Sequence, residues 1–125
     1  MKPSCEHTYN ETKNTIFSPN DPAMFQNTGN DCTWHIAAQE HEILKIETLR
    51  FKLSNCAKVK YRDYVQVFDG DSEKSTKLNE LCGFHTNKII ILGSRNSLFV
   101  KFHFWKGSGQ ANPTFELKIS VLKGS

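Results

Sequence analysis

Apolar and polar side chains alternate with a period of two along most of this chain. The alternation is clearest over five segments: 33–37, 44–53, 64–68, 98–104 and 115–121. Successive side chains of a strand point to opposite faces, so this period predicts half-buried strands that each leave one face in water. Windows of eleven residues show no helical period. The predicted apolar faces are Trp34 and Ile36; Leu44, Ile46, Thr48, Phe51 and Leu53; Val65 and Val67; Leu98, Val100, Phe102 and Phe104; and Phe115, Leu117, Ile119 and Val121.

Clusters of turn-forming residues separate the predicted strands. They are Ser18-Pro19-Asn20-Asp21-Pro22, Asp69-Gly70-Asp71 and Gly107-Ser108-Gly109. Proline, glycine, asparagine and aspartate favour turns because they fix or tolerate the backbone angles that a turn needs. Many short strands with turns between them are typical of an antiparallel sandwich. The predicted fold class is therefore all-β.

The composition limits what the chain can be. With 125 residues, of which 38% are hydrophobic, it suits one ordered domain over residues 1–125 and is too short for a two-domain enzyme. The longest apolar run, Ile89–Leu92, falls far short of the ~20 residues of a membrane helix, so we expect no direct membrane insertion. A net charge of +3 without a recognisable motif argues against a nucleic-acid partner. Met1 is interpreted as an expression start and Gly124-Ser125 as a tag remnant.

Four cysteines are dispersed along the chain, at Cys5, Cys32, Cys56 and Cys82. They lack the CxxC spacing of structural zinc sites, so we expect no metal centre from them. An even number of cysteines in a small domain favours two disulfides and an oxidising compartment. Four cysteines allow three connectivities, and the spacing does not select among them.

A series of short motifs follows a specific order. After Cys5 and Thr15–Asn20, it runs through Asp31-Cys32-Thr33-Trp34, Leu53-Ser54-Asn55-Cys56, Asp63–Gly70, Leu81-Cys82-Gly83 and Ser94–Phe102, and it closes with a strand at Phe115. In this order and spacing the chain resembles the CUB domain of extracellular proteins over essentially its whole length.

The resemblance implies a jelly-roll-like sandwich of two antiparallel sheets, with disulfides Cys5–Cys32 and Cys56–Cys82. It also implies a non-catalytic extracellular module, without a cofactor of its own, that binds a protein partner as part of a larger secreted or cell-surface protein. A glycan or heparin binder, as in the spermadhesin branch of the same fold, is the alternative. That alternative would use Lys58, Lys60, Arg62 and Lys106 to hold a sulfated glycan.

Many CUB domains hold Ca²⁺ with one glutamate and two aspartates at one end of the sandwich. By the resemblance, these three positions fall on Ser54, Asp63 and Trp105. A hard cation needs several oxygen ligands, including charged ones, and only one carboxylate remains here. We therefore expect binding without calcium and no bound metal.

Basic and aromatic residues gather in two segments that the resemblance places side by side. Lys58, Lys60 and Arg62 precede Asp63, and Phe104 and Trp105 precede Lys106. An exposed tryptophan ringed by cations is typical of a binding hot spot and favours an acidic partner. In the proposed arrangement Lys106 or Arg62 pairs with Asp63 and fixes the loop in place of a metal. The alternative is that Trp105 caps the sandwich and the cations are ordinary solvated charges.

Two further motifs concern catalysis and modification. The five histidines have no partner signature such as GxSxG, so we expect no enzyme activity. Asn10-Glu11-Thr12 is an N-glycosylation sequon, whereas a proline blocks Asn112-Pro113-Thr114. Asn10 is therefore a candidate glycosylation site, and its alternative is an unmodified surface asparagine.

Overall fold

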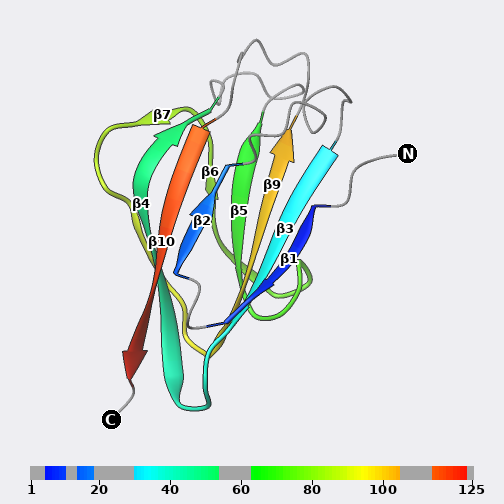
Figure 1. Cartoon of the computed structure of the whole chain (residues 1–125), viewed down its shortest axis with the longest axis vertical. Helices are drawn as coiled ribbons and strands as arrows, with labels where there is room; N and C mark the ends of the chain where they lie inside the picture. The colour runs from blue at the N-terminus through cyan, green and yellow to red at the C-terminus, as the bar shows by residue number, and fades with distance from the viewer. Residues whose placement is uncertain (1–4, 11–13, 19–29, 54–62, 105–113, 124–125) are drawn as a thin grey trace.

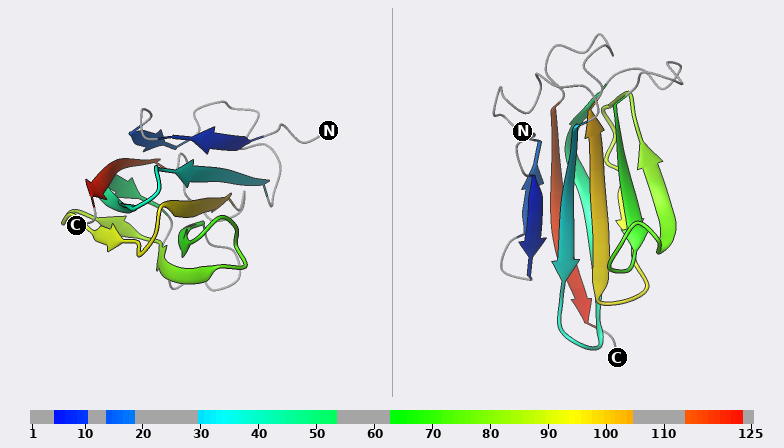
Figure 2. Two further views of the ribbon diagram at one scale, coloured as in Figure 1. Left: turned by 90° about the horizontal axis from the view of Figure 1, so that it is seen from below. Right: turned by 90° about the vertical axis from the view of Figure 1, so that its right-hand side faces the viewer.

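The computed structural model describes residues 5–10, 14–18, 30–53, 63–104 and 114–123, which form two β-sheets packed face to face (Figures 1 and 2). The first sheet, called here the β9 sheet, has the order β1 (Glu6–Tyr9), β3 (Asn30–Ala37), β9 (Ser97–Phe104), β5 (Tyr64–Asp69) and β6 (Thr76–Leu81). The second, the β4 sheet, has the order β2 (Thr15–Phe17), β10 (Thr114–Lys123), β4 (Glu42–Lys52) and β7 (Phe84–His85), and β8 (Ile90–Leu92) also pairs with β4. The predicted all-β sandwich is confirmed.

The core lies between the sheets and is built from the apolar faces that the alternation predicts. At its centre Phe115 of β10 meets Trp34 of β3 and Phe102 of β9, with ring centroids 6.1 and 5.0 Å apart and near edge-to-face angles. These three side chains are almost fully buried. Because they come from both sheets, their contacts hold the layers together, and aromatic pairs in this geometry add stability beyond the area they bury.

The outer face of the β9 sheet is less exposed to solvent than a simple alternation predicts. Phe68 of β5, predicted to face water, is only 6% exposed. It pairs with Phe99 on the neighbouring strand β9, and their ring centroids are 6.2 Å apart. The cross-strand neighbour covers the ring, which the period of a single strand cannot indicate.

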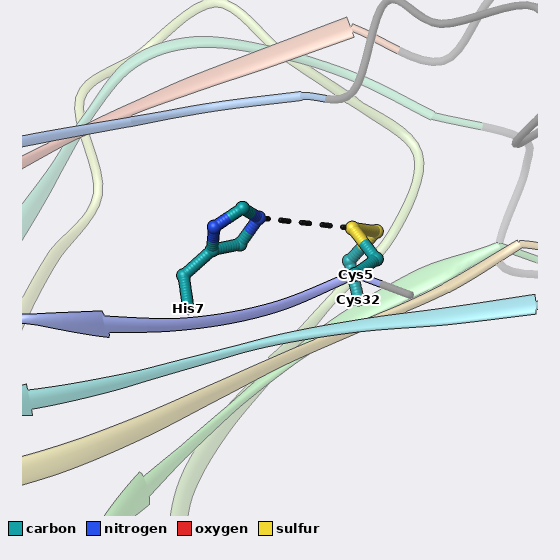
Figure 3. The surroundings of a disulfide bond; sticks show 3 residues. All are labelled: Cys5, His7 and Cys32. Carbon is teal, nitrogen blue, oxygen red and sulfur yellow. Dashed lines mark hydrogen bonds between the residues drawn. A yellow bond between two sulfur atoms is a disulfide. The ribbon is translucent and has the colours of Figure 1, made fainter. Parts of the chain in front are cut away.

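A disulfide fastens the edge of the β9 sheet. Cys5 and Cys32 are bonded, as the resemblance implied (Figure 3). The bond follows from a parallel pairing of β1 with β3, in which the amide of Thr33 donates to the carbonyl oxygen of Cys5 at 2.9 Å. His7 of β1 stacks on Trp34 at 5.5 Å. Cys82 is also disulfide-bonded, and its predicted partner Cys56 lies outside the described residues.

Strand β4 contains a bulge where it pairs with β10. Glu116 pairs with Arg50 and the next residue, Leu117, pairs with Thr48, so Leu49 has no partner of its own. Both Leu49 and Arg50 face solvent, and burial resumes at the following residue. The bulge explains why the predicted apolar face of this strand changes phase after Thr48.

Strand ends from both sheets meet at one end of the sandwich, called here the loop end, which is uppermost in Figure 1. Strands β3, β5 and β10 begin there, and β4, β6 and β9 end there, as the antiparallel pairings require. The segments 54–62 and 105–113 are attached to this end, because they connect β4 with β5 and β9 with β10.

Candidate interaction surface at the loop end

The structure places two of the seven predicted binding residues, Asp63 and Phe104, and the others lie outside the described residues. Those others are Lys58, Lys60, Arg62, Trp105 and Lys106. Tyr64 of β5 pairs with His103 of β9, so Asp63 and Phe104 adjoin the same pair at neighbouring strand ends. The strand ends from which the two basic and aromatic segments continue are therefore neighbours, whereas the segments themselves lie outside the described residues.

Phe104 was wrongly included in the binding surface. Its side chain is 4% exposed and belongs to the core cluster, where it continues the apolar face of β9. The alternation along β9 predicts that Phe104 points into the core. By the same alternation, the next residue, Trp105, is predicted to point outward. Phe104 is therefore a core residue that anchors the end of β9.

Asp63 is completely buried. A buried carboxylate must be hydrogen-bonded or paired, since desolvation of an uncompensated charge costs several kcal/mol. No buried side-chain oxygen or nitrogen of the described residues lacks a hydrogen-bond partner, and this includes the carboxylate of Asp63. Its predicted partners, Lys106 and Arg62, lie outside the described residues. Asp63 therefore belongs to the buried framework of the loop end.

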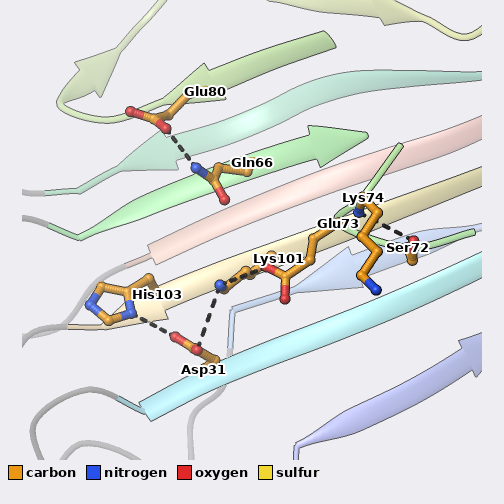
Figure 4. Close-up of polar contacts among 8 residues, drawn as sticks. All are labelled: Asp31, Gln66, Ser72, Glu73, Lys74, Glu80, Lys101 and His103. Carbon is orange, nitrogen blue, oxygen red and sulfur yellow. Dashed lines mark hydrogen bonds and ion pairs between the residues drawn. The ribbon is translucent and has the colours of Figure 1, made fainter. Parts of the chain in front are cut away.

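A polar network covers the β9 sheet beside the loop end (Figure 4). Nδ1 of His103 lies 2.6 Å from Oδ1 of Asp31, and the imidazole stacks on Tyr64 with centroids 4.9 Å apart. Nζ of Lys101 lies 3.0 Å from a carboxylate oxygen of Glu73 and 3.9 Å from Asp31. The network links the edge of the loop end to the turn after β5 and presents charges of both signs.

The charge state of Lys101 follows from its surroundings. Partial burial alone would lower the pKa of its ammonium group, but the hydrogen bond to Glu73 and the charges of Asp31 and Glu73 outweigh burial and raise the pKa above 10.5. Lys101 is therefore a fixed positive charge at physiological pH. The sequence indicated that Lys101 and His103 share the wet face of β9; the pairing with β3 that brings them to Asp31 had no local signal.

The described residues contain no cluster of three or more histidine, cysteine, aspartate or glutamate side chains that could hold a metal. Ser54 and Trp105, two of the positions that the resemblance equates with calcium ligands, lie outside those residues. Within the same part of the chain, no helix is long and apolar enough to cross a membrane.

The comparison with protein families agrees with the two-sheet sandwich. The family model of the CUB domain matches residues 5–118. The chain belongs to the CUB domain family. CUB domains are generally non-catalytic modules that mediate protein–protein interactions in extracellular proteins, either secreted or as part of an ectodomain.

Curated relatives of this CUB domain are much longer proteins. Tolloid-like protein 1 of Homo sapiens is 34% identical over 100 residues, which cover 78% of this chain and 9% of that protein. Cubilin of Homo sapiens is 33% identical over 102 residues, which cover 79% of this chain and 3% of that protein. The chain thus spans less than a tenth of either relative.

Solved structures share the fold at low sequence identity. The CUB1-EGF-CUB2 domains of rat MASP-1 align with a TM-score of 0.71 and 21% identity, covering 94% of this chain and 42% of that one. The MASP-1 CUB2 domain bound to Ca²⁺ aligns with a TM-score of 0.69 and 19% identity, covering 90% and 96%. At this identity the likeness shows the fold alone.

Proposed function

We propose that this CUB domain binds an extracellular protein partner through its loop end, without calcium. The observation that carries the proposal is the pairing of Tyr64 with His103, which attaches the segments 54–62 and 105–113 to neighbouring strand ends. The first segment carries three cations and the second carries a tryptophan and a lysine. Segments from both sheets attached at one end of a rigid sandwich are a common architecture for recognition.

The chemistry of the two segments favours an acidic partner. Lys58, Lys60, Arg62 and Lys106 supply positive charge, and Trp105 supplies a large apolar surface with a hydrogen-bond donor. Cations around an interface accelerate encounter with an acidic surface, whereas a central aromatic residue supplies most of the affinity.

Calcium independence rests on the ligand set. The fold accommodates calcium elsewhere, because the MASP-1 CUB2 domain was solved bound to Ca²⁺. In this chain a serine hydroxyl and an indole stand at two of the three acidic positions, and the third, Asp63, is buried and hydrogen-bonded. A single carboxylate is too few ligands for Ca²⁺ in competition with water.

The test compares capture of extracellular proteins by wild-type protein and by Trp105→Ala, with Phe17→Ala as control because Phe17 is a 60% exposed aromatic residue on the β4 sheet. Wild-type and Phe17→Ala should capture the same protein, and Trp105→Ala should weaken its binding by ~2 kcal/mol or more at an unchanged melting temperature. Exchange of EDTA for millimolar Ca²⁺ should leave capture and melting temperature unchanged. Undiminished capture by Trp105→Ala, or capture that requires Ca²⁺, contradicts the proposal.

Heparin chromatography distinguishes the glycan alternative. Binding to a sulfated polymer through a few cations weakens steeply with ionic strength, whereas an aromatic-centred protein interface does so far less. Tight heparin retention that Lys58→Glu and Lys60→Glu abolish, but that Trp105→Ala leaves intact, would favour the glycan alternative over a protein partner.

A further inference from the structure

A groove of about 410 Å³ lies beside strand β4, and its lining includes the core residue Phe51 and its ring partner His85. It runs where β4 meets β7 and the start of β10, and we call it the β4–β7 groove. The side chains that matter to its chemistry are Leu49, Arg50 and Lys52 of β4, Phe84 of β7, and Thr86 and Thr114. Lys52 pairs with Phe84 across the two strands, so these two side chains project together on the exposed side.

The bulge in β4 determines the chemistry of this groove. In a regular strand one of two successive residues would point into the core, but here Leu49 and Arg50 both face outward. Leu49 is 46% exposed, and Phe84 on the neighbouring strand is 65% exposed. An exposed aliphatic and an exposed aromatic side chain line one groove, which gives it an apolar floor that an ordinary solvated sheet face lacks.

The rim of the groove is positively charged. The side chain of Arg50 is 74% exposed, and its Nε is 3.7 Å from Glu116. This long contact leaves the two outer nitrogens of the guanidinium open. Lys52 is exposed and forms no ion pair with any residue that the structure describes. Nearby, Glu47 is already engaged by Lys45 at 2.9 Å and Lys88 at 3.2 Å. Among the residues that the structure describes, Glu47 and Glu116 are thus paired, while Lys52 and the outer nitrogens of Arg50 are open.

We propose that the β4–β7 groove binds an acidic peptide segment of a partner protein that carries one large apolar side chain. The apolar side chain lies between Leu49 and Phe84, and flanking carboxylates pair with Arg50 and Lys52. Arginine suits this role because its planar guanidinium can hold a carboxylate with two parallel hydrogen bonds. The site is distinct from the loop end and does not depend on Trp105.

The exposed apolar floor favours a peptide over the other occupants. A sulfated glycan would need the cations alone and would gain little from Leu49 and Phe84. A second copy of this chain would bring Arg50 and Lys52 against the same two cations in a twofold contact, which like-charge repulsion opposes.

The test is an NMR titration of the ¹⁵N-labelled protein with a capped hexapeptide of sequence DEFLDE. Amide shifts are expected in Leu49–Lys52 and Phe84–Thr86. Two companion peptides separate the contributions: KKFLKK removes the acidic groups, and DEGSDE removes the apolar ones. Both should bind about tenfold or more weakly than the first peptide, because each lacks one of the two kinds of contact.

Matched variants locate the site on the protein. Phe84→Ser and Arg50→Glu should each weaken the peptide by about tenfold. Phe17→Ser and Lys118→Glu change other exposed residues of the β4 sheet and should leave the affinity for the peptide unchanged, as should Trp105→Ala. A dispersed NMR spectrum of each variant shows that it is folded.

Several outcomes overturn the proposal. They are the absence of amide shifts at millimolar DEFLDE, amide shifts confined to other strands, and a loss of peptide affinity in Phe17→Ser as large as that in Phe84→Ser. Binding of heparin oligosaccharides at the same residues, insensitive to Phe84→Ser, would assign the groove to a glycan. Concentration-dependent dimers that Phe84→Ser abolishes would assign it to a second copy of the chain.

Discussion

Removal of the Cys5–Cys32 disulfide gives a direct measure of how the edge of the β9 sheet is stabilised. The bond joins residues 27 apart in the chain. In the chain-entropy model, closing a loop of that length removes ~12 cal/mol/K from the unfolded ensemble, which is about 3.5 kcal/mol at 25 °C. The double variant Cys5→Ala/Cys32→Ala should therefore lower the free energy of unfolding by about that amount in urea denaturation.

Hydrogen exchange distinguishes this entropic effect from a loss of native structure. The amide of Thr33 donates to the carbonyl oxygen of Cys5, so its protection reports whether β1 still lies against β3. We expect the Thr33 amide to remain protected from exchange in the double variant. Its protection should fall only as far as the lower free energy of global unfolding requires. A stability loss below about 1 kcal/mol, or a Thr33 amide that exchanges as in an unfolded chain while the core stays protected, would refute the reasoning.

Four further predictions concern single side chains. Asp69→Ala should destabilise the domain by ~1–3 kcal/mol in urea denaturation, and Asp69→Asn by less, because the carboxylate accepts from the amide and hydroxyl of Ser94 at 3.1 and 2.5 Å. The pKa of Glu47 is lowered by hydrogen bonds from its two lysine neighbours, so its contribution to stability should be complete above pH 4.5 and lost as the pH falls through the folded-state pKa, which a ¹³C titration of the carboxyl would follow. For Lys101, whose pKa is raised, the contribution should be complete below pH 10.5 and lost above it; a midpoint at or below 10.5 in an ammonium titration would contradict this. In a secretory host, the exposed Asn10 should carry a glycan, and an identical electrophoretic mobility of Asn10→Gln would show that it does not.

The sequence predicted the central strands well and the edge strands poorly. All five segments with a period of two are strands, because each buries one face in the core. β1 and β7 were not predicted, since they are short and lie at sheet edges, where pairing with a neighbour decides their conformation. β6 has no clear alternation, and its pairing with β5 shifts register after Val67. Local patterns carry no information on such pairings.

In the candidate site, too, local alternation predicted side-chain orientation, whereas contacts between strands could not be predicted. Alternation along β9 correctly orients Lys101 and His103 outward and Phe104 inward. Phe104 was assigned to the binding surface because it adjoins Trp105 and Lys106, without regard to this alternation. The contact of His103 with Asp31 depends on the register of β3 against β9, which is a long-range property. The β4–β7 groove depends on a bulge, visible in the sequence only as the change of phase between Thr48 and Phe51.

The gathering of strand ends at one end of the sandwich makes this domain a candidate host for grafted peptides. Leu53 and Asp63 are buried anchors on either side of one connecting segment, and Phe104 and Phe115 serve the same purpose near the other. These anchors are fixed by the core, so a replacement sequence need only span the same gap, and each doubling of its length adds ~0.6 kcal/mol of closure entropy. Recognition could therefore be rewritten at one end while the hydrophobic framework stays as it is.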